Sequence, residues 1–417
     1  QRLGFISLIK LRYSWGQSGN APTGTSPYIG KFSAVTPGYG DMSAVKPESP
    51  DLTHLKYETI TSNNIGVDVG LFSDRITFAV ELYTKVTDDM LQKKIKVPSS
   101  TGLSTVAWYN SGKMENRGWE FNIDVAAVRT KDWGLNFGFN ISQNKNKVLE
   151  LPENQSDETY TFGNKKYAYR VLMGDPLGSF YGYRYKGVYQ NVEETYAVDK
   201  TGQQIMDING APVVVKNGDQ KVYPGDAKYE DVNGDGVIDE NDIVYLGNSN
   251  PTLTGGLNFT LRYKKLSLVA ALHGRAGQKV INESRINMEN MYGKNNQSVA
   301  VLRRWRSEGD NTDIPRALYD KGYNYLGSDR FVEDASFLRL KTITLKYQFP
   351  ENWMKPLGIN KLEIYATGYD LFVWTKYTGQ DPEINLKNPD GSAAQVAIDS
   401  NNTPKAMRFA FGLNLRF

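Results

Sequence analysis

The chain has 417 residues and a net charge of +3, contributed by 49 basic and 46 acidic side chains that are spread along the whole sequence. Without a basic block or stripe, nucleic acid is not an expected partner. The absence of cysteine excludes disulfides, thiolate metal sites and a cysteine nucleophile. Two histidines in all leave no recognisable zinc or Ser/His/Asp site, so the sequence predicts no enzyme.

Ten segments of strand length follow one another along the chain, each with apolar and polar residues in alternation. In the second segment, Ile65 and Val67 alternate with Gly66 and Asp68. The ten segments centre on residues 11–15, 65–71, 76–82, 119–125, 135–141, 257–261, 266–272, 343–349, 362–366 and 409–417. No stretch has the roughly 20 apolar residues that a membrane-spanning helix needs. The chain opens directly on a strand-like run, so we expect a fragment of a longer protein with an all-β fold.

Alternation alone also fits a soluble β-sandwich, and the lengths of the connections discriminate between the two folds. Short turns follow Phe72, Val128, Tyr263 and Phe349, and long connections cover about 17–62, 86–117, 145–252, 276–335 and 373–406. This strict alternation predicts a transmembrane antiparallel up-and-down β-barrel with short periplasmic turns and long extracellular loops. Aromatic residues near strand ends, among them Trp15, Tyr83 and Trp133, fit its interfacial girdles.

Residues 231–242, within the long extracellular insertion 145–252, have the spacing of an EF-hand-like calcium loop. Oxygen donors stand at positions one, three, five, seven (through the main-chain carbonyl), nine and twelve: Asp231, Asn233, Asp235, Val237, Asp239 and Asp242. Gly236 occupies position six, where the loop turns sharply. The alternative is a solvated Asp/Asn/Gly turn, since position twelve lacks the usual Glu. We expect Ca²⁺ to order an insertion that has too little apolar content to order itself.

The closing segment "RFAFGLNLRF" ends the chain on an aromatic residue. Five apolar side chains fall on one face of this segment: Phe409, Phe411, Leu413, Leu415 and Phe417. A final strand of this kind resembles the signal that the bacterial barrel-assembly machinery recognises. It places the C-terminus in the periplasm and therefore every long connection outside the cell.

Four aromatic residues in the long connections or at their edges are candidate substrate contacts. Trp108, Tyr109, Trp374 and Tyr377 could stack on sugar rings or on peptide side chains. The alternative is that they belong to the interfacial girdle, which also concentrates aromatic residues at strand ends.

Several stretches resemble the SusC/RagA family of TonB-linked outer-membrane transporters. They are "LRYSWGQSGN", "NSGKMENRGWEFNIDV", "YPGDAKYEDVNGDGVIDENDIVYLGNSNPTLTGGLNFT", "FVEDASFLRLKTITLKYQFP", "WTKYTGQDPE" and "FAFGLNLRF". The resemblance implies that residues 1–417 form about the last ten strands of a 22-stranded barrel. The plug, the TonB box and the earlier strands, which such proteins carry upstream, are not among these residues.

The resemblance also implies a function. Members of this family import oligosaccharides or oligopeptides together with a SusD-like surface lipoprotein, and the TonB complex supplies the energy. The expected location is the bacterial outer membrane, in contact with its lipid. Two alternatives remain open at this point: a secreted β-rich module that binds calcium and serves adhesion or carbohydrate binding, and a passive porin.

Overall fold

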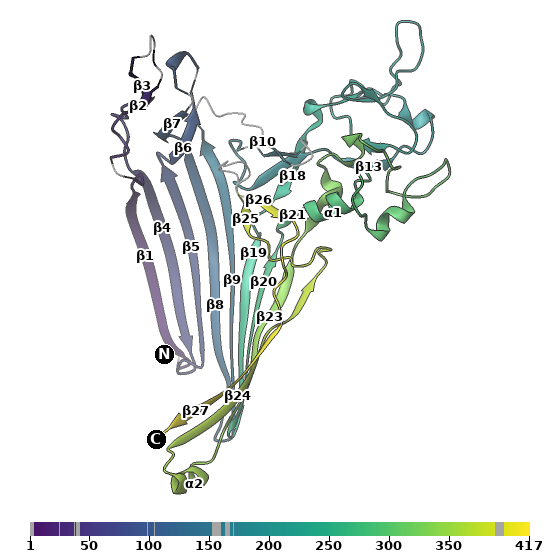
Figure 1. The fold of residues 1–417 in the computed structure, drawn as a ribbon. Coiled ribbons are helices and arrows are strands. Elements are labelled where there is room, and N and C mark those ends of the chain that lie inside the picture. The colour runs from purple at the N-terminus through teal and green to yellow at the C-terminus, as the bar shows by residue number, and fades with distance from the viewer. Residues whose placement is uncertain are drawn as a thin grey trace. The chain divides into compact units, whose positions relative to one another are not determined.

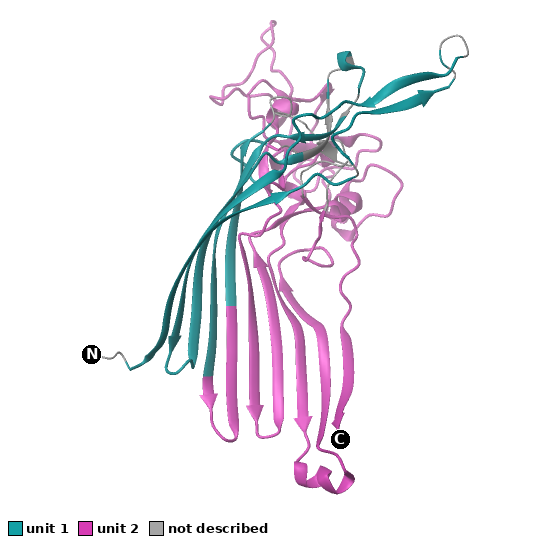
Figure 2. Ribbon diagram, turned by 90° about the vertical axis from the view of Figure 1, so that its left-hand side faces the viewer, with its two compact units in different colours: residues 1–126, 140–156, 172–176 teal, residues 127–139, 157–171, 177–417 magenta. Residues whose placement is uncertain are grey.

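The computed structural model describes residues 4–417 except 25, 37, 39–41, 98, 104, 152–159, 163–166, 170 and 388–395. The chain divides into two compact units, coloured separately in Figure 2. Unit 1 comprises residues 1–126, 140–156 and 172–176, and unit 2 comprises residues 127–139, 157–171 and 177–417. Among the described residues, no helix combines the length and the apolar character that crossing a bilayer requires.

Ten long strands form one antiparallel sheet in the order β1-β4-β5-β8-β9-β19-β20-β23-β24-β27 (Figure 1). Their bounds are Ile6–Asn20 (β1), Glu58–Leu71 (β4), Ile76–Asp88 (β5), Lys113–Arg129 (β8), Trp133–Glu150 (β9), Leu253–Tyr263 (β19), Leu266–Ala276 (β20), Phe337–Gln348 (β23), Lys361–Thr375 (β24) and Arg408–Arg416 (β27). All ten predicted segments are therefore strands, and the all-β prediction is confirmed. Neighbouring strands of the sheet follow one another along the chain, as an up-and-down topology requires.

The strand register places apolar and polar side chains on opposite faces within each unit. In unit 1, one row across the sheet contains Leu11, Val67, Val80 and Phe121. The exposed fraction of Leu11 is 77%, so this apolar face is not covered by a second sheet within unit 1. A soluble sandwich would bury such a face. The β-sandwich alternative therefore fails for these strands.

The same separation of faces holds in unit 2. One apolar row runs from Leu261 through Leu268, Leu345 and Ala366 to Phe411. The polar row beside it contains Arg262, Ser267, Lys346, Tyr365 and Gly412. The period of two predicted from the sequence is thus maintained across five adjacent strands.

Except for the helices α2 (Glu351–Met354) and η8 (Lys355–Leu357), which lie in the turn between β23 and β24, the short elements lie in the long connections. In unit 1 they are β2 (Lys31–Val35), β3 (Ala44–Ser49), β6 (Leu91–Lys96), η2 (Ser99–Thr101) and β7 (Thr105–Asn110). In unit 2 the short strands are β10 (Tyr160–Phe162), β11 (Tyr167–Tyr169), β12 (Ser179–Gly182), β13 (Tyr185–Val188), β14 (Lys216–Asn217), β15 (Gln220–Lys221), β16 (Ala227–Tyr229), β17 (Val237–Ile238), β18 (Val244–Asn248), β21 (Lys279–Asn282), β22 (Val332–Asp334), β25 (Leu386–Lys387) and β26 (Val396–Asp399). Its helices are η3 (Glu193–Thr195), η4 (Glu240–Asp242), α1 (Glu283–Glu289), η5 (Val299–Arg303), η6 (Gly322–Tyr325), η7 (Asp329–Phe331), α2 (Glu351–Met354) and η8 (Lys355–Leu357).

The connection between β9 and β19 differs in two respects from its prediction. It begins later, because β9 continues to Glu150, and it has an apolar core of its own. That core comprises Tyr183, Tyr189, Ala197, Val215, Val222, Ala227, Tyr229, Ile238 and Leu326. The expectation that this insertion lacks the apolar content to order itself is therefore wrong. Leu326 comes from the connection between β20 and β23, so two long connections share one core.

The predicted girdle position of Tyr83 is also wrong. Tyr83 pairs with Gly118, which places it on the polar face of the sheet, in the row next to Glu81. Its ring lies directly over the glycine, because a Cβ built on Gly118 would stand 2.5 Å from the Tyr83 hydroxyl oxygen. The Tyr83 hydroxyl donates to Asn144 Oδ1 on β9 at 3.1 Å.

We expect Gly118→Ala to destabilise the barrel, because a Cβ at this position would also clash with the Gln143 main-chain oxygen. Overpacking of this kind costs about 1–3 kcal/mol. The full-length protein is heated and run on a denaturing gel, and the measurement is the temperature at which the band of the compact folded form is replaced by that of the unfolded form. Gly16→Ala on β1 is the matched control, since a Cβ at Gly16 would have no atom within 4 Å. Equal transition temperatures for the two variants would contradict the prediction.

Candidate functional site

Charged side chains concentrate on the polar face of the long strands. In unit 1, the Arg12 guanidinium on β1 donates to both carboxylate oxygens of Asp68, at 2.9 and 2.8 Å. The same guanidinium contacts Glu81 Oε1 on β5 at 2.5 Å. Three adjacent strands are thereby joined through side chains as well as through their backbones. A polar face of this kind suits a water-filled lumen.

In unit 2, a denser charge network covers the polar face of β23 and β24. The Arg339 side chain is only 3% exposed and contacts the carboxylates of Asp381 and Glu383, which belong to the connection after β24. Glu383 also pairs with Lys341 and Lys405. Since buried charges require partners, this network fixes Asp381, Glu383 and Lys405 of that connection against the polar face of the sheet.

An irregularity in the sheet supplies this network with one further carboxylate. Thr342 pairs with Tyr369 and Leu340 pairs with Phe372, so Asp370 and its successor share one position opposite Lys341. Asp370 adopts a φ of 50°, and its Oδ1 lies 3.5 Å from Lys341 Nζ. Bulges re-aim side chains in this way, and they concentrate near functional sites.

The elements in the long connections of unit 2 form a platform, which we define by the sheets β22-β21-β26-β25 and β10-β11-β12-β18 together with α1. Its apolar core comprises Tyr167, Phe180, Ile281, Ile286, Phe331, Val396 and Ile398. These residues come from three different long connections. The Tyr167 hydroxyl donates to the Ser328 carbonyl at 2.7 Å, within this core. The connections of unit 2 therefore fold together rather than as separate loops.

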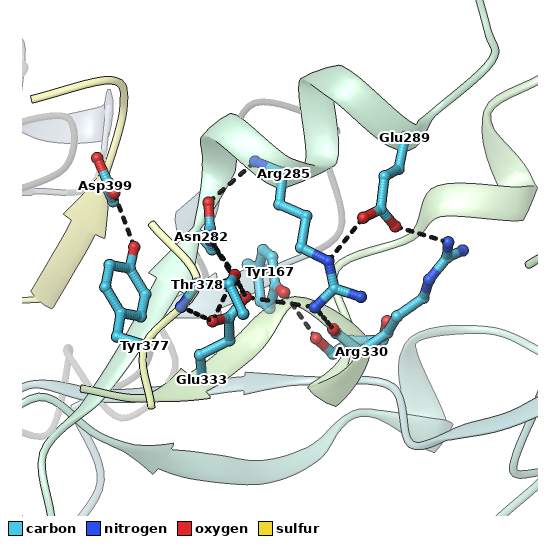
Figure 3. A network of polar contacts seen from close by, with 10 residues as sticks. Tyr167, Asn282, Arg285, Glu289, Arg330, Glu333, Tyr377, Thr378 and Asp399 are labelled. Atoms are coloured by element: carbon cyan, nitrogen blue, oxygen red, sulfur yellow. Dashed lines mark hydrogen bonds and ion pairs between the residues drawn. The ribbon is translucent and has the colours of Figure 1, made fainter. Parts of the chain in front are cut away.

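A network of buried ion pairs holds α1 to its neighbours in the platform (Figure 3). The Glu289 carboxylate accepts from Arg285 Nε at 2.8 Å and from the Arg330 guanidinium at 3.0 Å. Arg285 also contacts Glu333 Oε1 at 3.3 Å. Glu333 accepts in turn from the Thr378 main-chain N–H at 2.9 Å, which joins the connection after β24 to the same network.

A pocket of about 420 Å³ opens beside this network. Most of its lining residues have polar side chains, among them Asn282, Ser284, Arg285, Thr378 and Asp399, although the surface that they expose to the pocket is mostly apolar. Most of these groups already have partners within the platform: Ser284 Oγ donates to the Asp399 carbonyl, and Asn282 Nδ2 donates to Glu333 and to Thr378. The polar groups around the pocket are therefore held in place by bonds within the platform.

The EF-hand-like loop 231–242 forms a compact turn in which the backbone wraps around acidic side chains. The Asp231 carboxylate accepts from the N–H groups of Gly234 and Gly236, each at 2.7 Å. Both glycines have positive φ, 70° and 80°, as the sharp turn requires. The Asp242 carboxylate accepts from the N–H groups of Val232 and Asp239, at 2.7 and 2.8 Å, and so ties the end of the loop to its start.

The chemistry of the loop fits a hard cation in part. Asp242 is fully buried, and burial raises the pKa of its carboxyl group. No Lys, Arg or His side chain in the described part of the chain forms an ion pair with Asp242, so a cation would compensate a buried carboxylate there. However, the described residues include no group of three or more His, Cys, Asp or Glu side chains that converge on a metal position. Calcium binding at Asp231, Asn233, Asp235, Val237, Asp239 and Asp242 stays a prediction.

The four aromatic residues proposed to contact substrate occupy different environments. Tyr377 is 6% exposed and its hydroxyl donates to Asp399 Oδ2 at 2.7 Å, so it holds the platform together and does not face a ligand. Burial, followed by the Asp399 carboxylate, raises the pKa of Tyr377. Trp374 pairs with Leu338 on the apolar face of the sheet and stacks on Phe372, which favours the girdle alternative.

The other two aromatic residues lie in unit 1, on the hairpin of β6 and β7. Tyr109 is half exposed, and Trp108 lies opposite Lys93 in that hairpin. Trp108 and Tyr109 lie in unit 1, whereas Trp374 and Tyr377 lie in unit 2, so the two pairs are described separately. Tyr109 therefore keeps an accessible ring that a ligand could contact, whereas Tyr377 does not.

The closing strand β27 carries Phe409, Phe411, Leu413 and Leu415 on one exposed face, and Phe417 follows it directly. The apolar face predicted from "RFAFGLNLRF" is therefore present. Recognition of this strand by an assembly machinery stays a prediction.

No pattern in the sequence indicated the ion pairs that organise unit 2. Arg339, Asp381 and Glu383 stand in stretches that contributed to the family resemblance, "FLRLKTITLKYQ" and "GQDPE", yet no spacing rule joins a strand to a loop 42 residues later. The bulge at Asp370 did leave a signal in the sequence, because "GYDLF" interrupts the alternation: Asp370 falls in line with the apolar positions Ile364 and Ala366.

Comparison with protein families supplies the remaining observation. Residues 3–371 match the family described as "TonB dependent receptor-like, beta-barrel". The chain belongs to this family. The SusC/RagA resemblance is confirmed by its relatives: the chain is 30% identical over 422 residues to TonB-dependent receptor P3 of Formosa agariphila and 28% identical over 433 residues to TonB-dependent receptor SusC of Bacteroides thetaiotaomicron.

Solved structures support the same fold for this TonB-dependent receptor barrel. A chain of the RagAB peptide transporter superposes with a TM-score of 0.76 at 22% sequence identity, and the match covers 99% of residues 1–417. The chain spans about 40% of the length of the curated relatives that it matches and 41% of the RagAB chain. Because the chain is only part of that length, the cargo and partners of the relatives can be proposed for this protein but are not shown for it.

We expect Glu289→Gln to loosen the platform, because it leaves Arg285 and Arg330 facing a neutral side chain in a buried setting. Removing one member of a buried ion network costs about 3–5 kcal/mol. The measurement is the rate of limited proteolysis within 277–336 in the folded full-length protein. The matched control is Glu308→Gln, an exposed carboxylate in the same connection. Equal cleavage rates in the two variants would show that the network does not stabilise this connection.

Proposed function

We propose that residues 1–417 form the C-terminal part of the wall, and the outer connections, of an outer-membrane importer of oligomeric nutrients. The observation that carries the proposal is the ten-stranded antiparallel sheet, whose apolar face is left uncovered and whose polar face carries paired charges. Short turns and long, folded connections alternate along this sheet, as in transmembrane barrels. We infer from this alternation that the long connections lie outside the cell and the C-terminus in the periplasm, as in other transmembrane barrels.

The relatives support a proposal about partners. One relative is SusC, and the solved structure that superposes on this chain is a chain of the RagAB peptide transporter. We infer a SusD-like surface lipoprotein that closes over the platform, a TonB complex that supplies energy through parts outside residues 1–417, and assembly by the barrel-assembly machinery. The cargo is an oligosaccharide or an oligopeptide, held by polar groups of the outer connections while the barrel itself performs no covalent chemistry.

The charge network around Arg339 bears on the choice between an importer and a porin. Because it fixes Asp381 and Glu383 on the polar face of the sheet, the segment that carries them would lie at the lumen side and would narrow the opening of the barrel. A passive porin needs an unobstructed channel, whereas an importer needs a closed one that opens on demand. This feature favours the importer over the porin. The family match disfavours the secreted adhesion module.

A bilayer experiment tests this function. The full-length protein, reconstituted in planar bilayers, should show almost no open conductance, whereas a porin would conduct continuously. Purified together with its lipoprotein partner, it should bind members of either a glycan library or a peptide library, and deletion of the lipoprotein should abolish uptake. Continuous conductance, or uptake that does not depend on the lipoprotein, would refute the importer.

We also propose that loop 231–242 binds one Ca²⁺. The loop packs into the core of its insertion, since Gly236 lies against Ala197 and its carbonyl accepts from the Lys216 N–H at 3.0 Å. A cation there would neutralise the acidic cluster and fix the loop in this position. The ion supplies cohesion and no catalytic chemistry.

Asp235→Ala should remove most of the roughly one equivalent of calcium that the purified protein binds, because a charged ligand is lost. Elemental analysis after dialysis measures the bound metal, and proteolysis within the loop reports its order. Asp207→Ala is the matched control: the Asp207 carboxylate likewise accepts from N–H groups of its own turn, those of Asn209 and Ala211, but lies outside the loop. Equal calcium contents in Asp235→Ala and the parent would refute the site.

A further inference from the structure

Five acidic residues are buried in the described part of the chain, and all five lie in unit 2. Three of them pair with arginine side chains: Asp226 with Arg316, Glu289 with Arg285 and Arg330, and Asp381 with Arg339. The other two, Asp242 and Asp399, form no ion pair with a described Lys, Arg or His side chain. Asp242 belongs to loop 231–242, for which a cation is proposed above. Asp399 is therefore the buried carboxylate whose charge still lacks a partner.

Asp399 is the last residue of β26 and is only 2% exposed. Its carboxylate accepts from the Tyr377 hydroxyl at 2.7 Å (Figure 3) and from the Asn402 N–H at 3.2 Å. Both donors are neutral, so a negative charge remains in a buried setting. Burying a charge costs free energy unless an opposite charge compensates it. A cation that reaches Asp399 would therefore be held firmly.

The pocket of about 420 Å³ in the platform adjoins this carboxylate, because Asp399 and Gly379 both belong to its lining. A Cβ on Gly379 would stand 2.6 Å from Asp399 Oδ2. Any other residue at position 379 would therefore place a side-chain atom against this oxygen. Glycine keeps the wall of the pocket thin beside the carboxylate.

The other charges beside the pocket do not compensate Asp399. Arg285 belongs to the lining, but its guanidinium contacts Glu289 and Glu333. Arg330 contacts Glu289 as well. With Asp399 included, three carboxylates stand against two guanidiniums, which leaves one negative charge. The charge balance thus favours a cationic ligand over an anionic one.

The surface that the pocket exposes is mostly apolar. Met288, on α1, belongs to this lining and is 43% exposed. Ligand pockets commonly measure about 300–1,000 Å³, so this pocket suits one long side chain with its adjoining main chain. Lysine and arginine combine methylene groups, which pack on apolar surface, with a cationic end. Both features of the pocket are matched by such a side chain.

We propose that this pocket binds a lysine or arginine side chain of a peptide cargo, with the methylene groups along Met288 and the cationic end on the Asp399 carboxylate. The side-chain amides of Gln380 and Asn401 also line the pocket. They have no hydrogen-bond partner among the described residues and can bond to the main chain of the peptide. The proposal rests on the importer function proposed above and narrows its cargo.

Two other cationic ligands fit the pocket less well. An amino sugar carries its ammonium group directly on the ring, without the methylene chain that the apolar surface would receive. A metal ion would need several converging ligands, and the described residues include no group of three or more His, Cys, Asp or Glu side chains that could hold one. The pocket therefore favours a basic peptide.

Calorimetry with two capped peptides tests the site. The probes are acetyl-Ala-Ala-Lys-Ala-Ala-amide and the same peptide with norleucine, which has the methylene chain of lysine but no ammonium group. The full-length protein in detergent should bind the lysine peptide about tenfold more tightly, because only this peptide forms a charge-assisted hydrogen bond. Asp399→Asn keeps an oxygen for the Tyr377 hydroxyl and should bind both peptides equally. No preference in the parent, or the same preference in Asp399→Asn, would overturn the proposal.

Two further variants serve as controls, and the gel band of the folded form verifies that each variant folds. Asp334→Asn removes a platform carboxylate that accepts from the Ser336 N–H and does not line the pocket. It should keep the tenfold preference, and loss of the preference would reveal a general attraction for cations instead of a site. Met288→Ser should weaken the binding of both peptides by a similar factor, because it removes apolar surface and no charge. Unchanged affinities in Met288→Ser would place the peptide elsewhere and contradict the proposal.

The binding measurement uses neither the lipoprotein nor an energy source, so its outcome is separate from transport. A protein that binds the lysine peptide as described but imports nothing would refute the importer and leave this inference intact. Binding of glucosamine oligomers in place of the lysine peptide would overturn this inference and leave the importer standing.

Discussion

Successive side chains of a β-strand point to opposite faces, and the rest of this structure depends on how ten long strands use that geometry. Their apolar faces gather Leu, Val, Ile and Phe side chains and remain uncovered within each unit. Their polar faces gather charges, which pair with one another across strands. A sheet with these two faces is suited to separate lipid from a water-filled interior. Every other feature has to be compatible with this separation.

Glycine is part of how the polar face is bonded. A glycine on that face has no side chain and leaves space above the backbone. Gly66 leaves this space for the Arg12 side chain, and Gly118 leaves it for the Tyr83 ring. The crossing side chain then links strands that are not neighbours in the sheet. Backbone hydrogen bonds join only adjacent strands, so these crossings add cohesion over a longer range. Tyr365 and Gly412 repeat the arrangement at the end of the sheet.

The long connections of unit 2 are organised by two kinds of interaction. Apolar cores join residues from different connections, as with Leu326 in the core of the insertion after β9. Buried ion pairs, such as those of Glu289 with Arg285 and Arg330, fix the positions of the elements that surround these cores. The lipoprotein that we propose as a partner would meet a folded surface there, which reduces the entropy cost of binding.

The amino-acid sequence by itself determined the ten strands, their two faces and the alternation of short and long connections, because each depends on a local period or on a length along the chain. It also contained the calcium-loop pattern, whose residues are contiguous. Only the tertiary structure decided that the Tyr83 hydroxyl reaches Asn144, that Tyr377 is buried, and that Arg339 meets Asp381 and Glu383. These outcomes depend on register and on contacts between distant segments. A shift of one residue in register exchanges the two faces of a strand, and no local pattern specifies which loop a buried charge will meet.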